Sequence, residues 1–183
     1  MRGERIALIG PNGVGKSTFI KILMGFLEAD SGTVIKNENL KIGYYSQEFE
    51  TFDMEKTVVE TFTDAVGQSE GFARAFLGRY MLSGNKIYQK VTTLSGGEKT
   101  RLAISLLTAN NYNLLILDEP TTYLDVLSQR IILEALKEYK GAMLIVSHTP
   151  EFIAELNPTR AYIFPDEKTV YWENSLVNKI SEA

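Results

Sequence analysis

Residues 10–18 have the residue types and spacing of a phosphate-binding loop. They read GPNGVGKST and fit the pattern G-x-x-x-x-G-K-[ST]. The glycines allow successive backbone N–H groups to turn inward around a phosphate at the start of a helix. We expect Lys16 to reach the β- and γ-phosphates of a nucleotide and the Ser17 hydroxyl to ligate Mg²⁺. The residues expected to contact the nucleotide are Asn12, Gly13, Gly15, Lys16, Ser17 and Thr18.

Asp118 and Glu119 form a second candidate group, because they directly follow the apolar run at residues 114–117. A short apolar run is typical of a buried strand, and α/β folds place ligands at the carboxyl ends of their strands. Asp118 would assist Mg²⁺, directly or through water, and Glu119 could polarise an attacking water as a general base. The alternative is a charged turn that caps the strand, and the phosphate loop in the same chain weakens it.

Ser95, Gly96 and Gly97 are the third group. A serine followed by two glycines at the start of a helix supplies a second N-terminus that can bind an anion. Ser95 is also a good N-cap residue, so a plain helix start is the alternative interpretation.

The elements that must position these groups alternate between strands and helices. Short apolar or β-rich runs predict strands at residues 6–9, 33–35, 41–45, 114–117 and 143–146. Apolar residues at helical spacing predict helices at residues 17–24, within 57–82, after 95 and at 127–139. A β-hairpin is expected at residues 161–172, and residues 83–90 are expected to form a loop. This alternation indicates an α/β core with a largely parallel sheet.

The composition excludes several other kinds of protein. The 183 residues suffice for one domain with a hydrophobic core but not comfortably for two. The net charge of −4 gives no support for tight, autonomous nucleic-acid binding. The absence of cysteine excludes disulfides and thiolate chemistry, and one histidine is too few for a histidine metal cluster. No apolar run approaches the roughly 18 residues of a membrane span, so we expect a cytoplasmic protein without direct membrane insertion.

Three stretches of the chain together resemble the motifs of ATP-binding-cassette (ABC) ATPases, in residue type and in order. The Walker A motif is matched by residues 10–18, the signature by residues 94–98 and the Walker B motif by residues 118–120. The resemblance covers nearly the whole chain and implies ATP and Mg²⁺ as cofactors. It implies a P-loop NTPase-type α/β fold in which a largely parallel sheet is flanked by helices.

The resemblance also implies a domain layout. Residues 1–183 would form a single ABC ATPase domain, with its core at about 1–48 and 94–183 and a small helical subdomain inserted at about 50–93. The family's opening strands, with the aromatic residue that stacks on adenine, would precede Met1. No residue of this chain can be nominated for that stack, so weak nucleotide binding is expected.

Three further residues match family positions. Gln47 corresponds to the glutamine that contacts Mg²⁺ and the attacking water, and His148 to the switch histidine that contacts the γ-phosphate. Asp125 matches the D-loop that crosses to a partner cassette, although read alone it is the N-cap of the next helix. The implied catalytic residues are therefore Glu119, His148 and Gln47. The implied metal ligands are Ser17, Gln47 and Asp118. Ser95, Gly96, Gly97 and Asp125 would add contacts to the nucleotide of the partner.

The spelling of the motifs resembles the ABC-F branch of the family, whose members are ribosome-associated and are not transporters. Transporter cassettes usually carry glutamine where this chain has Glu98, while residues 121–123 and 149–150 depart from the usual ABC-F spelling. The order of features resembles a C-terminal cassette. The implied partners are a second ABC cassette, paired head to tail, and the ribosome. The alternatives are a transporter subunit that binds a membrane permease, and a non-catalytic fragment gated by ATP.

Overall fold

The computed structural model describes residues 3–46, 52–122 and 124–181. The chain divides into two compact units. Residues 1–44, 112–119 and 140–183 form the first, which we call the sheet unit. Residues 45–111 and 120–139 form the second, which we call the helical unit.

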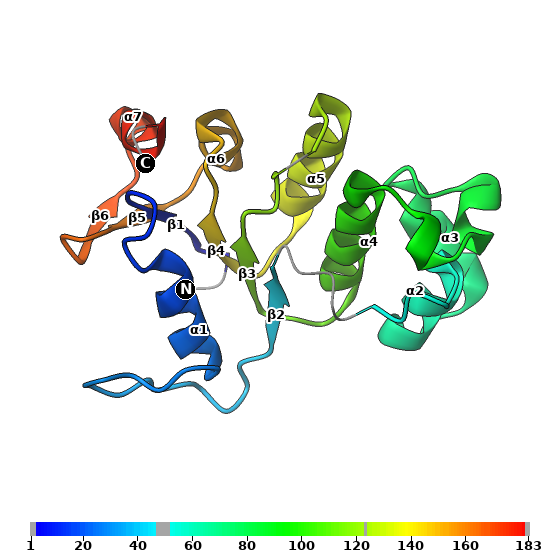
Figure 1. The fold of residues 1–183 in the computed structure, drawn as a ribbon, viewed down its shortest axis with the longest axis horizontal. Coiled ribbons are helices and arrows are strands. Elements are labelled where there is room, and N and C mark those ends of the chain that lie inside the picture. The colour runs from blue at the N-terminus through cyan, green and yellow to red at the C-terminus, as the bar shows by residue number, and fades with distance from the viewer. Residues whose placement is uncertain (1–2, 47–51, 123, 182–183) are drawn as a thin grey trace. The chain divides into compact units, whose positions relative to one another are not determined.

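A six-stranded sheet in the order β2-β3-β4-β1-β5-β6 dominates the sheet unit (Figure 1). Its strands are β1 (Arg5–Ile9), β2 (Ile42–Tyr45), β3 (Leu114–Asp118), β4 (Ala142–Val146), β5 (Arg160–Ile163) and β6 (Lys168–Tyr171). Strands β3, β4, β1 and β5 pair in parallel, whereas β5 and β6 form an antiparallel hairpin. The predicted α/β fold with a largely parallel sheet is therefore confirmed, as is the hairpin near the end of the chain.

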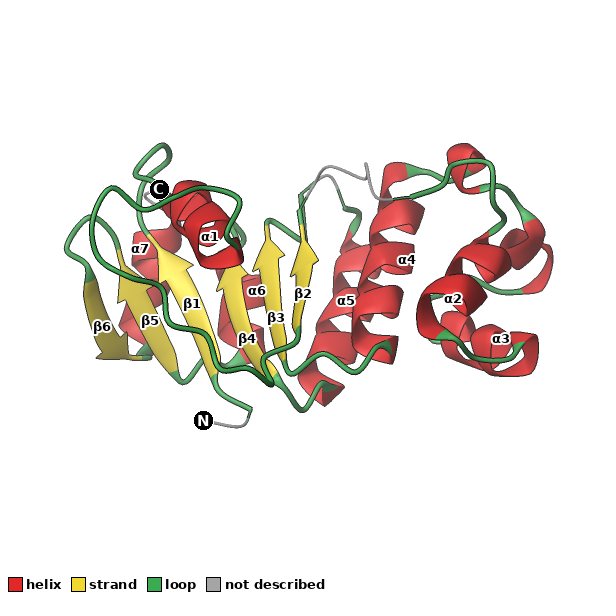
Figure 2. Ribbon diagram, turned by 90° about the horizontal axis from the view of Figure 1, so that it is seen from below, coloured by secondary structure: helices red, strands yellow, loops and turns green. Residues whose placement is uncertain are grey.

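Helices cover both faces of this sheet. Helix α1 (Lys16–Met24) lies on one face, and α6 (Pro150–Leu156) and α7 (Val177–Ser181) lie on the other (Figure 2). Helix α1 ends as predicted at Gly25, which adopts a left-handed conformation with φ 86° that favours glycine. Its buried Ile20 packs on Leu8, Ile116 and Leu144 from three neighbouring strands. The apolar strands and the apolar stripe of α1 thus form one core.

The prediction of a strand at residues 33–35 is wrong. These residues have no regular structure, and Ile35 is 90% exposed. A strand needs a neighbouring strand to pair its backbone N–H and C=O groups. Among the described residues, residues 33–35 belong to none of the six strands that pair in the sheet. Local β-propensity alone therefore does not make them a strand.

The helical unit contains four α-helices in its described residues. These are α2 (Val58–Val66), α3 (Glu70–Gly78), α4 (Gly96–Ala109) and α5 (Val126–Glu138). Two short 3₁₀ helices are present, at Gly84–Tyr88 and Val91–Thr93. The first lies in the segment at residues 83–90 that was predicted to be a loop. Each helix buries at least one large apolar side chain completely (Phe62, Leu77, Leu102 and Leu136), and α4 packs against α2, α3 and α5. The predicted helices are confirmed, whereas the predicted subdomain boundary at about residues 50–93 stays a prediction.

No helix in residues 3–46, 52–122 and 124–181 combines the length and the apolar character that crossing a membrane requires.

Replacement of Ile20 by alanine should destabilise the protein far more than replacement of Ile35. Ile20 is fully buried in the core of the sheet unit, so its truncation should cost about 2–5 kcal/mol. The exposed Ile35 should cost less than about 0.5 kcal/mol. Urea denaturation followed by circular dichroism measures both values. An equally large loss with Ile35→Ala would show that residues 33–35 are packed after all.

Candidate functional site

The phosphate loop connects β1 to α1, and glycine is required at several of its positions. Gly13 and Gly15 have φ angles of 76° and 107°, which residues with a Cβ rarely adopt. Gly10 has a φ of 155°, and a Cβ at this position would lie 2.8 Å from the Cβ of Phe164 and 2.9 Å from its carbonyl oxygen. The loop therefore starts in direct contact with the residue that follows β5. Only glycine fits this approach.

The N-terminus of α1 is open to an anion. Its N-cap residue, Gly15, makes no side-chain hydrogen bond, whereas α2, α4 and α5 are each capped by a polar side chain. The first helical hydrogen bond of α1 runs from the Phe19 N–H to the Gly15 carbonyl, at 2.8 Å. The amides of Lys16, Ser17 and Thr18 precede this bond, so helix geometry leaves them without an acceptor inside the helix. These amides and the helix dipole favour a phosphate.

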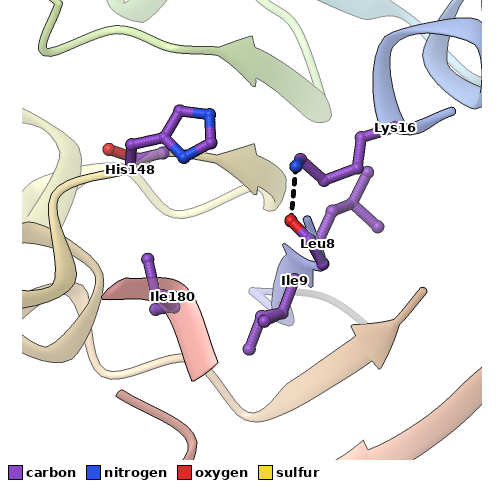
Figure 3. Close-up of a pocket in the computed structure, with 7 residues that line it drawn as sticks. Leu8, Ile9, Lys16, His148 and Ile180 are labelled. Atoms are coloured by element: carbon purple, nitrogen blue, oxygen red, sulfur yellow. Dashed lines mark hydrogen bonds between the residues drawn. The ribbon is translucent and has the colours of Figure 1, made fainter. Parts of the chain in front are cut away.

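Lys16 supplies a positive charge beneath the loop. Its Nζ donates a hydrogen bond to the carbonyl of Gly10, at 2.6 Å (Figure 3), and a second one to the carbonyl of Pro11, at 3.1 Å. Burial lowers the pKa of Lys16, while the nearby carboxylates of Glu119 and Asp118 act in the opposite direction. Asn12, Gly13, Ser17 and Thr18 are exposed around the buried lysine. The loop thus offers accessible donors on its outside and a fixed cation inside.

Asp118 ends β3 and receives a hydrogen bond from the Ser17 hydroxyl, at the first turn of α1. Burial raises the pKa of Asp118, and this hydrogen bond and Lys16 oppose the rise. A hydroxyl beside a carboxylate is an all-oxygen donor set. Mg²⁺ typically binds through one or two carboxylates together with substrate phosphates, so these residues fit it. Within the described residues no cluster of three or more acidic, histidine or cysteine side chains could hold a metal by itself.

Glu119 and His148 contact each other through two pairs of atoms. The backbone N–H of His148 donates to Glu119 Oε2 at 3.2 Å. The ring Nε2 of His148 lies 3.3 Å from Glu119 Oε1. The Glu119 N–H in turn donates to the carbonyl of Val146, at 2.9 Å. Burial raises the pKa of the Glu119 carboxyl, against the effects of His148 and Lys16. A carboxylate with raised proton affinity, held in place by a neighbour, is suited to act as a general base.

The structure thus brings most of the predicted site together at the carboxyl edge of the parallel strands. Nine of these residues lie in the sheet unit, in the phosphate loop and at the ends of β3 and β4: Asn12, Gly13, Gly15, Lys16, Ser17, Thr18, Asp118, Glu119 and His148. Gln47 lies outside the described residues.

Two residues beside this edge were not predicted. A small cavity, with room for about one water molecule, is lined by Lys16, Ser147, His148 and Ile180 among others (Figure 3). Ser147 is buried and accepts a hydrogen bond from the Thr149 N–H at 3.2 Å, so it shapes the turn that presents His148. Its position between an apolar strand and the histidine was a usable signal. Nothing in the sequence pattern marks Ile180, which comes from α7.

The remaining predicted residues lie in the helical unit, around the N-termini of α4 and α5. Ser95 is the N-cap of α4, as the alternative interpretation predicted, because its hydroxyl oxygen accepts the Glu98 N–H at 3.3 Å. Asp125 caps α5 in the same way through the Ser128 N–H, at 2.9 Å. A Cβ on Gly97 would lie 3.4 Å from Ser128 Oγ, so Gly97 packs against the start of α5. Gly96 is the first residue of α4.

Comparison with known proteins identifies the class to which this fold and site belong. The family model described as "ABC transporter" matches residues 1–122, and the chain belongs to this family of ATP-binding cassettes. The sequence resemblance to ABC ATPases is therefore confirmed.

The relatives of the chain include ABC-F proteins. It is 43% identical, over 85% of its length, to ABC transporter F family member 2 of Arabidopsis thaliana. It is 41% identical, over 90% of its length, to the ATP-binding protein Uup of Haemophilus influenzae. The chain spans only about a quarter of these relatives, 23% and 26% of their respective lengths.

Two solved structures share the fold. One is the archaeal ribosome recycling factor aABCE1 in complex with the ribosomal stalk protein aP1, with a TM-score of 0.72 and 28% identity over 92% of this chain and 34% of that chain. The other is the ATP-binding cassette MJ0796, a dimer in a post-hydrolysis state bound to ADP and Pi, with a TM-score of 0.74 over 94% of this chain and 87% of that chain. At 23% identity, the second likeness concerns the fold alone.

Alanine should be tolerated less well at Gly10 than at Gly13. Both positions have a positive φ, which costs a residue with a Cβ about 1–2 kcal/mol. Gly10→Ala should lose about 1–3 kcal/mol more, because its Cβ would overlap Phe164, whereas a Cβ on Gly13 meets nothing within 4 Å. Thermal unfolding without nucleotide compares the two variants. Equal losses would show that the approach of Phe164 does not constrain the loop.

Proposed function

We propose that this chain is an ATPase cassette that hydrolyses Mg²⁺-ATP as one half of a head-to-tail pair, in an ABC-F type protein that acts in translation. One observation carries the proposal. The open N-terminus of α1, Lys16, and the carboxylates of Asp118 and Glu119 meet at one edge of the sheet. An anion site beside a raised-pKa carboxylate is what in-line attack on a phosphate requires.

The roles of the residues follow from their positions. The loop amides and Lys16 would bind the phosphates, and Ser17 and Asp118 would hold Mg²⁺. The bound ion would neutralise charge that develops on the phosphate oxygens. Glu119 would accept a proton from the attacking water while the water oxygen bonds to the γ-phosphorus and the bond from that phosphorus to the leaving oxygen of ADP breaks.

His148 would keep the Glu119 carboxylate oriented for this proton transfer, since it contacts both carboxylate oxygens. Gln47 would contribute to the metal and to the water, as the family resemblance implies.

The pairing proposal concerns the helical unit. Ser95, Gly96 and Gly97 begin a capped helix, and the Ser95 hydroxyl still has a proton to donate because only its oxygen is used in the cap. In a head-to-tail pair this serine would donate to the γ-phosphate of the nucleotide held by the second cassette. Asp125, at the start of α5, would cross to that cassette. ATP would then close the pair and hydrolysis would release it.

The proposed assignment to the ABC-F branch is based on the relatives of the chain and on the residues of its motifs. The names of the relatives include an ABC transporter F family member, and one structural neighbour is described as a ribosome recycling factor. The first supports an assignment to the ABC-F branch, in keeping with Glu98 in the signature, and the second supports the ribosome as a partner. The cytoplasmic location expected from the sequence stays a prediction.

Replacement of Glu119 by glutamine should leave ATP binding intact and lower phosphate release about 10²- to 10⁴-fold, because the general base is removed. The same variant should accumulate an ATP-bound dimer, which light scattering detects. In the parent, the rate of phosphate release per mole should rise with protein concentration. Glu38→Gln, at an exposed position, is the matched control and should behave as the parent does. Turnover of Glu119→Gln at the parent rate would exclude Glu119 as the base.

The ATP-bound Glu119→Gln protein should sediment with ribosomal subunits in a sucrose gradient. The trapped pair should stay on its target, because release requires hydrolysis. The nucleotide-free protein is the control and should remain at the top of the gradient. If the trapped protein copurifies with a membrane permease instead, the ABC-F assignment is wrong.

A further inference from the structure

We propose that Lys86 is a positioning residue for the signature serine, because it neutralises Glu98 so that the N-terminus of α4 can receive the phosphate of a partner's ATP. The inference rests on the proposed head-to-tail function. It assigns a role to a residue of the segment at 83–90, which was predicted to be a loop.

The first turn of α4 contains an electrostatic conflict. A helix N-terminus attracts anions through its free amides and its dipole. Glu98 nevertheless places a carboxylate in this turn, where its Oε2 accepts the Ser95 N–H at 3.0 Å. This hydrogen bond completes a capping box that fixes the Ser95 backbone. The residue that orders the serine therefore also carries a charge that repels a phosphate.

Lys86 resolves this conflict from the 3₁₀ helix Gly84–Tyr88. Its Nζ donates to Glu98 Oε1, the carboxylate oxygen that does not contact Ser95. Each oxygen of Glu98 thus has its own partner, one that holds the cap and one that balances the charge. Because the carboxylate is ionised in this arrangement, a cation is needed to cancel its field.

The pair is also better shielded from solvent than other ion pairs described in the helical unit. The Glu98 side chain is 17% exposed, compared with 60% for Asp64 in the Lys56–Asp64 pair and 75% for Glu55 in the Lys90–Glu55 pair. Water and salt screen exposed pairs strongly, and such pairs contribute little. The charge of Glu98 is therefore felt more strongly at the helix terminus, and so is its neutralisation.

The ionisation state of Glu98 agrees with this geometry. Burial acts to raise its pKa, but the hydrogen bonds from Lys86 and from the Ser95 amide outweigh burial, and the pKa lies below its ordinary value. Arg101 adds a smaller attraction from the same helix. Glu98 is therefore a full negative charge at neutral pH, and Lys86 is its principal counter-charge.

A mixed-pair experiment isolates this role. A small amount of parent protein is mixed with an excess of Glu119→Gln protein before ATP is added, and the initial burst of released phosphate is measured per parent chain. Only the parent's own site can then react, and it faces the signature of the Glu119→Gln partner. A change at residue 86 in the partner is thereby read in trans, in a site whose own residues are unaltered.

A Glu119→Gln partner that also carries Lys86→Met should slow the burst about tenfold, because the uncompensated carboxylate repels the phosphate. Adding Glu98→Gln to that partner should restore the burst. Glutamine keeps an oxygen acceptor for the Ser95 N–H and removes the charge. A partner with Lys56→Met is the matched control, since Lys56 forms an exposed pair with Asp64 at 2.9 Å and should leave the burst unchanged.

Each result decides between explanations. An unchanged burst with Lys86→Met, or a slow burst that Glu98→Gln does not restore, would overturn the role of Lys86. A merely structural role would give the second of these results, because Glu98→Gln does not replace the lost contact. No burst with the Glu119→Gln partner alone would contradict head-to-tail pairing itself and, with it, the basis of this inference.

Discussion

The parallel pairing of β3, β4 and β1 is the constraint on which the candidate site depends. Asp118 pairs in register with Val146, and β1 lies on the other side of β4. Parallel neighbours end at the same edge of a sheet, so the segments that follow them must emerge side by side. The phosphate loop, the two carboxylates and His148 follow three different strands. They become one site only because those strands run in the same direction.

Burial gives this site its chemistry. Burial disfavours the charged forms of Lys16, Asp118 and Glu119. The attraction between the lysine and the two carboxylates partly offsets this cost. A similar arrangement occurs in the helical unit at the start of α4. There the Glu98 carboxylate accepts the Ser95 N–H in the helix cap and is paired with Lys86. In both units, a group proposed to bind phosphate lies close to carboxylates whose charge is balanced by a lysine.

The sequence predicted the parts of the structure that depend on local pattern. Short-range signals exist for strands β3 and β4, for the helix after the phosphate loop and for the caps at Ser95 and Asp125. All of these are present in the structure. The wrong strand at residues 33–35 shows the limit, because strand formation requires a partner that local propensity does not supply. The short helices α6 and α7, and the contact of Lys86 with Glu98, were missed because they depend on tertiary packing. The residues of each motif, and the gathering of Lys16, Asp118 and His148 at one edge of the sheet, were predictable, whereas the contacts of Lys86 with Glu98 and of Gly10 with Phe164 were not.

The contact of Gly10 with Phe164 has a consequence for the order of events during synthesis. Strand β1 is synthesised before both of its neighbours, β4 and β5, and the Thr159 hydroxyl donates to the Arg5 carbonyl across a separation of 154 residues. Contacts this distant in sequence form slowly, because closing such a long loop costs conformational entropy before any contact is gained. The phosphate loop is therefore encoded near the start of the chain but completed near its end. The chain must therefore be translated at least as far as Phe164 before the candidate site can form.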